Sequence, residues 1–154
     1  VASRGLGDVY KRQDRRAYLR RIPEVLEMIE LPEIENSRVS NLSGGQTRRV
    51  GIAASLIHSP DILFLDEPTA GLDPQARIEV RHLLNRLKDS ATIILSTHLQ
   101  DDLEHVADNV VALHNGRIAY EGEWNRLKAV SADNFSSVST DPLERALAYV
   151  ASKH

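Results

Sequence analysis

Residues 62–68 read Ile62-Leu63-Phe64-Leu65-Asp66-Glu67-Pro68, and this stretch decides the fold class of the chain. A short, continuous apolar run is typical of a strand that is buried on both faces of a parallel sheet. Two carboxylates follow where that strand ends, and the carboxyl edge of an open α/β sheet is where such folds bind ligands. The stretch therefore predicts a buried parallel strand with Asp66 and Glu67 at a functional edge.

The following segments predict that this strand belongs to a βαβ unit. Residues 74–89 carry apolar side chains at helical spacing, and residues 91–96 form a second apolar run. A strand, a helix and a strand in this order predict two parallel strands joined by a crossover helix. The chain is therefore expected to be an α/β protein.

The rest of the chain predicts shorter elements. Residues 23–31 and 99–107 have the spacing of short helices, and Asn115-Gly116 predicts a hairpin between strands at 109–114 and 117–121. Residues 131–140 are polar and predict a loop. Asp141 and Pro142 predict the start of a last helix, which is expected to bury Leu143, Ala146, Leu147 and Val150.

Upstream of the strand, Leu42-Ser43-Gly44-Gly45-Gln46 predicts the start of a helix. Ser43 is a good N-terminal cap, and the apolar residues that follow recur at helical spacing. Gly44 and Gly45 let the backbone approach a ligand closely, while the free amides and the dipole of a helix start favour a phosphate. One interpretation is an ordinary capped helix; the other, which the complete five-residue match favours, is an anion site.

The carboxylates after the strand suggest hydrolytic chemistry. Asp66 is suited to hold Mg²⁺ through water, since hard cations prefer oxygen ligands. Glu67 is suited to orient and deprotonate an attacking water. The alternative is a strand that simply ends in an acidic turn before Pro68. His98 follows the second strand at the same predicted edge, although a single histidine at a strand end is usually a surface residue.

Taken together, these segments resemble the motifs of ATP-binding cassette (ABC) ATPases. Residues 42–46 resemble the signature motif, residues 62–68 the Walker B motif, Gly71-Leu72-Asp73 the D-loop, and residues 93–98 the H-loop. The resemblance implies that His98 contacts the γ-phosphate of ATP and that Asp73 lies at the nucleotide interface. Thr47 departs from the glutamine, arginine or methionine that is commoner after the signature.

The resemblance also implies a two-subunit mechanism. Two nucleotide-binding domains face each other head to tail, and each ATP lies between one subunit's P-loop and the other's signature. Ser43, Gly44, Gly45 and Gln46 would then serve the partner's nucleotide. The sequences of these motifs are most similar to those of ATPase subunits of ABC transporters, especially subunits paired with a separate exporter-type permease. The resemblance therefore implies ATP and Mg²⁺ as cofactors. It also implies a second nucleotide-binding domain and a membrane permease as partners.

Three features expected from the resemblance are missing from the sequence: the P-loop, the glutamine-bearing Q-loop and the aromatic residue that stacks on adenine. No G-x-x-x-x-G-K-[ST] segment occurs, so the P-loop that cradles the β- and γ-phosphates is absent. The fold is therefore expected to be a P-loop NTPase-type three-layer α/β sheet with part of the ABC helical subdomain, truncated at the N-terminus. Residues 14–122 are expected to form the C-terminal part of the nucleotide-binding domain, and residues 123–154 a helical extension.

The first residues are expected to be foreign to the domain. Residues 3–13 match the in-frame translation of a transposase sequencing adaptor, and we interpret residues 1–13 as a non-native leader. The alternative is a natural basic N-terminal arm.

The composition and net charge of the chain argue against a membrane-spanning protein and against a nucleic-acid binder. The chain has 154 residues, no cysteine, 42% hydrophobic residues and a net charge of −3. No apolar run approaches the roughly 20 residues of a membrane span, and the negative charge argues against a nucleic-acid binder. We expect a cytoplasmic ATPase, peripheral on the inner membrane face through its permease. Alternatives are a soluble ABC ATPase of translation or DNA maintenance, and an inactive fragment.

Overall fold

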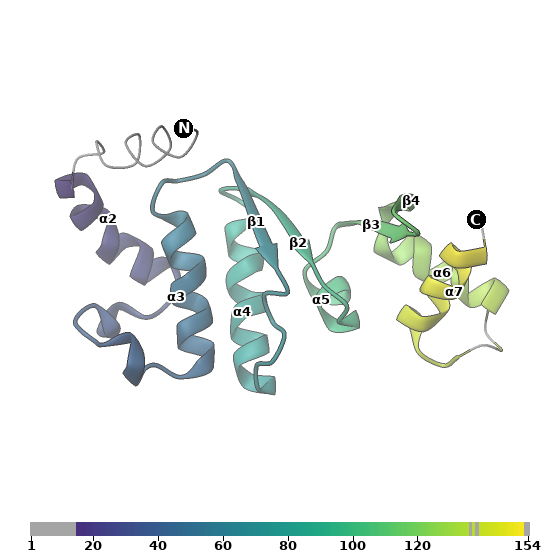
Figure 1. Cartoon of the computed structure of the whole chain (residues 1–154), viewed down its shortest axis with the longest axis horizontal. Coiled ribbons are helices and arrows are strands. Elements are labelled where there is room, and N and C mark those ends of the chain that lie inside the picture. The colour runs from purple at the N-terminus through teal and green to yellow at the C-terminus, as the bar shows by residue number, and fades with distance from the viewer. Residues whose placement is uncertain (1–14, 136, 138, 153–154) are drawn as a thin grey trace, which may run out of the picture. The chain divides into compact units, whose positions relative to one another are not determined.

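The computed structural model describes residues 15–135, 137 and 139–152 of the chain (Figure 1). The predicted leader, residues 1–13, lies outside the described residues. The chain divides into two compact units: one contains the residues up to Leu65 together with Gly71–Ile94, and the other contains Asp66–Ala70 together with Leu95–His154. No helix in the described ranges is both long and apolar enough to cross a membrane.

Helices dominate the first unit. It contains α2 (Arg15–Met28), the short 3-10 helices η1 (Pro32–Ile34) and η2 (Val39–Asn41), α3 (Gly44–Leu56) and α4 (Pro74–Leu87). Figure 1 shows α2, α3 and α4 one beside the next, and α3 contacts both of the others. Buried Arg49 on α3 stabilises this arrangement, because it donates to the Ile29 carbonyl at 3.2 Å and pairs with Glu79 of α4 at 3.0 Å.

The helix expected over residues 23–31 begins earlier and contains a proline. Helix α2 starts at Arg15 and continues through Pro23. Its buried side chains include Val25 and Leu26, with Ile29 directly after the helix, as the spacing predicted. Both predicted bounds, Pro23 and Leu31, are therefore wrong, because the helix begins before the proline and ends at Met28.

The predicted βαβ unit is confirmed. Strands β1 (Ile62–Asp66) and β2 (Thr92–Ser96) form a two-stranded sheet, and α4 lies between them in the chain. The strands are parallel, since the Thr92 amide donates to the Asp61 carbonyl at the start of both and the Glu67 amide donates to the Ser96 carbonyl at their ends. Asp73 caps α4 by accepting from the Ala76 amide at 3.0 Å.

Burial of β1 differs from the expectation of a strand buried on both faces. Leu63 is 3% exposed, whereas Phe64 is 72% exposed and Ile62 and Ile94 are about half exposed. The side chains of a strand alternate between two faces. No element of the described ranges covers the face that carries Phe64, so that face is open to solvent.

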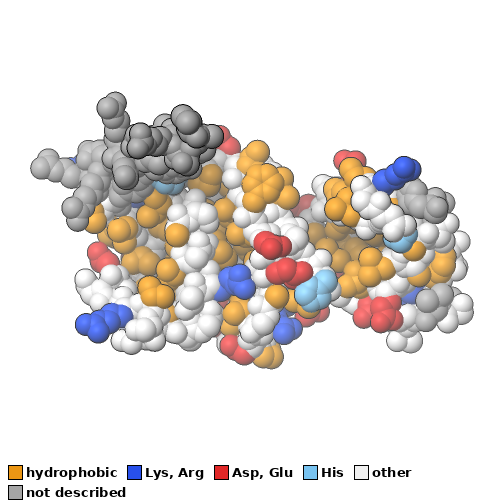
Figure 2. Space-filling view, in the orientation of Figure 1, with side chains coloured by type: hydrophobic (Ala, Val, Ile, Leu, Met, Phe, Trp, Pro, Cys, Tyr) orange, Lys and Arg blue, Asp and Glu red, His pale blue; other side chains and the backbone are white. Residues whose placement is uncertain are grey.

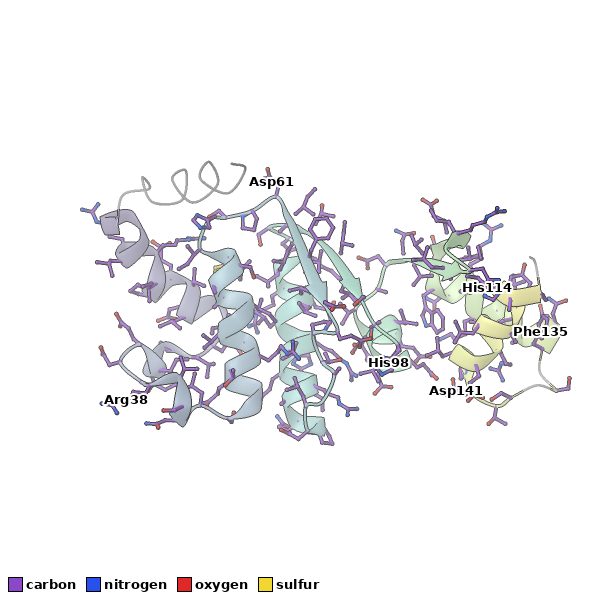
Figure 3. The ribbon with its side chains drawn as sticks, viewed as in Figure 1. Arg38, Asp61, His98, His114, Phe135 and Asp141 are labelled. Atoms are coloured by element: carbon purple, nitrogen blue, oxygen red, sulfur yellow. The ribbon has the colours of Figure 1, made fainter. Side chains whose placement is uncertain are left out.

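The second unit surrounds a small core of its own. It contains α5 (Gln100–His105), β3 (Asn109–His114), β4 (Arg117–Glu123), α6 (Trp124–Phe135) and α7 (Pro142–Ser152). The core consists of Trp124 and Leu127 of α6 with Ala146 and Val150 of α7. Phe135, labelled in Figure 3, meets Tyr149 edge to face with the ring centroids 6.2 Å apart.

The predicted hairpin is confirmed. Strands β3 and β4 are antiparallel, and Asn115 and Gly116 both have positive φ, 48° and 74°, as a tight primed turn requires. The start of α7 is also as predicted, because Asp141 accepts from the Leu143 amide at 2.7 Å.

Two expectations for the C-terminal segment are wrong. Residues 131–135 belong to α6 instead of a loop, because buried Ser131 donates its hydroxyl to the Lys128 carbonyl and so fits inside a helix. Leu147 is 55% exposed, since Ala146 and Val150 occupy the buried side of α7. The proposed boundary between residues 122 and 123 stays a prediction.

Candidate active site

The site expected at the carboxyl edge of the sheet lies within the second unit. Directly after β1, Glu67 adopts a φ of +46°, a left-handed conformation that is uncommon for a residue with a side chain. Its amide donates to the Ser96 carbonyl at 3.1 Å and contacts the Ser96 hydroxyl at 3.2 Å. The ends of β1 and β2 therefore hold Glu67 in an unusual backbone conformation, a feature that occurs most often at functional sites.

The structure brings Glu67 and His98 together. The Glu67 Oε1 atom lies 2.6 Å from Nδ1 of His98. Figure 2 shows acidic side chains and a histidine next to one another on this face, and Figure 3 labels His98.

The second oxygen of the Glu67 carboxylate has no hydrogen-bond partner among the described residues. This atom, Oε2, is buried. An unpaired buried carboxylate oxygen is costly in a folded protein. A general base needs a free lone pair within hydrogen-bond reach of its water, and the role of Glu67 as that base stays a prediction.

Asp66 lies beside this pair at the end of β1. Its Oδ1 atom accepts from the Ser96 hydroxyl at 2.5 Å, and its side chain is exposed. Among the described residues there is no cluster of three or more His, Cys, Asp or Glu side chains that could hold a metal ion by itself. Mg²⁺ usually takes only one or two carboxylates and completes its shell with waters and substrate phosphates. The exposed Asp66 carboxylate fits such an ion.

The predicted helix start at residues 42–46 is confirmed, and it lies in the first unit. The Ser43 hydroxyl accepts from the Gln46 amide at 3.2 Å, while the Ser43 amide donates to the Gln46 side-chain oxygen at 3.0 Å. These two bonds form a reciprocal capping box. The spacing of Ser43 and Gln46 is itself a sequence signal for a capping box. The two hydrogen bonds give Gln46 a local role in ordering the helix start.

The two glycines of this segment have different surroundings. A Cβ atom at Gly44 would meet nothing within 4 Å, whereas a Cβ at Gly45 would lie 2.7 Å from the Cβ of Ala76 on α4. Gly45 is buried and is needed for the contact between α3 and α4. Within residues 42–46, Ser43 and Gly44 are exposed and Gly45 is buried. The close approach to a ligand expected of both glycines stays a prediction.

Asp73, assigned to the D-loop, is engaged in its own helix. It is the N-cap of α4, and Arg77 in the same first turn donates to the Leu72 carbonyl at 3.0 Å. Gly71 reaches the left-handed conformation with a φ of 72°. This segment is therefore well ordered by local contacts, and a role of Asp73 at a nucleotide interface stays a prediction.

Sequence reasoning missed a buried polar group behind Glu67 and His98. Asp102 of α5 accepts hydrogen bonds from the hydroxyls of Thr69 and Thr97. Asp102 falls at the i+3 position of the apolar set Leu99, Leu103 and Val106. A carboxylate on an apolar helix face was the available signal, because a buried charge requires hydrogen-bonding partners.

Fold and site together define the chain as part of a P-loop NTPase-type α/β domain. Residues 6–70 match the profile of a family described as "ABC transporter". The chain is 40% identical over 119 residues to the uncharacterized ABC transporter ATP-binding protein YxlF of Bacillus subtilis, covering 77% of this chain and 40% of the relative. It is 41% identical to Nod factor export ATP-binding protein I of Neorhizobium galegae, covering 73% of this chain and 33% of the relative.

A solved structure agrees with these relatives. The structure of an ATP binding subunit of an ABC transporter superimposes with a TM-score of 0.65 at 26% identity, covering 95% of this chain and 59% of that chain. The chain belongs to the ABC transporter ATPase family. It spans 33% to 40% of the length of these two curated relatives.

Proposed function

We propose that the full protein containing this chain is the ATP-hydrolysing subunit of an ABC transporter. The observation that carries the proposal is the Glu67 carboxylate, which contacts His98 through one oxygen and has no partner among the described residues at the other. Residues that activate water are expected to have this combination of fixed orientation and a free lone pair. Membership of the ABC family supports ATP as the substrate.

Glu67, His98 and Asp66, at the carboxyl edge of the sheet, have different roles in the proposed hydrolysis. The Glu67 Oε2 atom accepts a proton from the attacking water while His98 keeps the carboxylate oriented and contacts the γ-phosphate. Asp66 would hold Mg²⁺, which when bound neutralises charge on the phosphates. The hydrogen bond from Ser96 orients the Asp66 carboxylate for that purpose.

The exposed helix start at Ser43 and Gly44 is proposed to serve a second subunit. A capped helix start with free amides favours phosphate, and the resemblance to the ABC family supports a position for this element at a head-to-tail dimer interface. The permease partner is proposed to be a separate membrane protein of exporter type, a class supported by the similarity to a Nod factor export protein. The subunit would then lie in the cytoplasm on the inner membrane face.

The test is the substitution Glu67→Gln in the full-length protein. Loss of the general base is expected to lower ATP turnover by about 10²- to 10⁴-fold while Mg-ATP binding remains. The matched control is Glu33→Gln, which makes the same change at an exposed glutamate of η1. Turnover of the Glu67→Gln protein at the wild-type rate would remove Glu67 from this role.

A further inference from the structure

We propose that Asp102 is a positioning residue for ATP hydrolysis, holding the segments that carry Glu67 and His98 in register. This inference rests on the proposed function. Asp102 lies on α5, touches neither of the two reactive side chains in the contacts described above, and would act through Thr69 and Thr97. All of these residues belong to the second unit.

The geometry makes Asp102 a hydrogen-bonding centre between two loops. Its Oδ2 atom accepts from the Thr69 hydroxyl at 2.6 Å and from the Thr97 hydroxyl at 2.9 Å. Asp102 is 1% exposed and Thr69 is fully buried. Burial keeps water from replacing these two hydrogen bonds.

The two threonines adjoin the reactive residues. Thr69 follows Glu67 by two positions, and the Ala70 amide donates back to the Glu67 carbonyl at 3.2 Å. Thr97 directly precedes His98, and its hydroxyl also accepts from the Leu99 amide at 3.0 Å. Asp102 therefore ties together the backbone on either side of the 2.6 Å contact between Glu67 and His98.

A purely structural role makes a different prediction from a positioning role. If Asp102 only stabilises the fold, its loss lowers the amount of folded protein but leaves the properties of each folded molecule unchanged. If Asp102 positions Glu67, folded molecules bind Mg-ATP normally and turn it over slowly, because small misplacements of reacting groups slow chemistry by up to about 10²-fold.

The experiment measures kcat and KM for ATP in the full-length protein. Asp102→Ala, Thr69→Val and Thr97→Val each remove part of the centre, and the valine variants keep the shape of the side chain. We expect kcat to fall by about 10-fold or more in each while KM changes less than about twofold. Thr97→Ser restores the hydroxyl and should recover most of the lost kcat.

Asp101→Asn is the matched control, since it removes the charge of the preceding, exposed aspartate on the same helix. It should leave both constants at wild-type values. If Asp102→Ala does not fold, the two threonine variants decide the outcome. Wild-type kcat in Thr69→Val and Thr97→Val, or no recovery in Thr97→Ser, would overturn the inference. An inactive wild-type protein would instead refute the proposed function, so the two failures are distinguishable.

Discussion

At the scale of single residues, the two adjacent glycines of residues 42–46, Gly44 and Gly45, differ in how much space surrounds them. Gly44 borders open space, while Gly45 faces the Cβ of Ala76 at a distance that no added side chain tolerates. Both positions are helical, so neither glycine is required by backbone conformation. The requirement at Gly45 comes from the packing of α3 against α4.

This difference predicts opposite outcomes for two alanine substitutions. Gly44→Ala should raise the free energy of unfolding by up to about 1 kcal/mol, because alanine is the better helix former. Gly45→Ala should lower it by about 1–3 kcal/mol, since the new methyl group overpacks against Ala76. Chemical denaturation of the two variants provides the measurement, each serving as the control for the other. Equal stability of the pair would contradict the packing explanation.

At the scale of elements, the N-terminus of helix α3 is exposed to solvent. Ser43 and Gly44 are exposed there, and the capping box with Gln46 uses the Ser43 hydroxyl and amide locally. The first turn of an α-helix in general leaves backbone amides without an intrahelical partner, and these can bind a ligand. In the proposed dimer this helix start faces the partner's nucleotide.

The proposed trans arrangement can be tested with mixed full-length subunits. One subunit carries Ser43→Arg and the other a disabled P-loop, so that one composite site keeps both halves intact. We expect this heterodimer to retain ATP-dependent closure at that site, measured by distance-sensitive fluorescence across the interface. A doubly substituted homodimer, with no intact site, is the control. A heterodimer that forms but shows no closure would place Ser43 in its own subunit's site.

At the scale of the whole molecule, the parallel sheet has one open face. Phe64 is 72% exposed and Ile62 and Ile94 about half exposed, while Leu63 on the opposite side is buried. Exposed apolar patches mark either an interaction surface or an aggregation hazard. Because the chain spans 33% to 40% of the relatives' length, we expect other segments of the full protein to cover this face.

Phe64→Ala should therefore act differently in the two contexts. In the 154-residue chain it should reduce aggregation and change the free energy of unfolding by less than about 0.5 kcal/mol, as exposed substitutions do. In the full-length protein it should cost about 3–5 kcal/mol, as the loss of a buried phenylalanine does. Leu63→Ala is the control, expected to destabilise both proteins. Equal, small effects of Phe64→Ala in both would show that this face stays exposed.

The sequence alone was sufficient for features that depend on near neighbours in the chain. The βαβ order, the hairpin at Asn115-Gly116, the caps at Ser43 and Asp141, and the placing of Asp66 and Glu67 at a strand end all follow from periodicity and local hydrogen bonding. These patterns extend over a few residues, and the chemistry that produces them is local.

Only the tertiary structure decided the features that join distant parts of the chain. The Glu67–His98 contact spans 31 positions, the Thr69–Asp102 bond spans 33, and Gly45 meets Ala76 on another helix. The exposure of Phe64 belongs with these, since an apolar run predicts burial without saying which element provides it. Such contacts depend on how separate elements pack against one another. The local sequence around either residue does not identify the residue that it will contact.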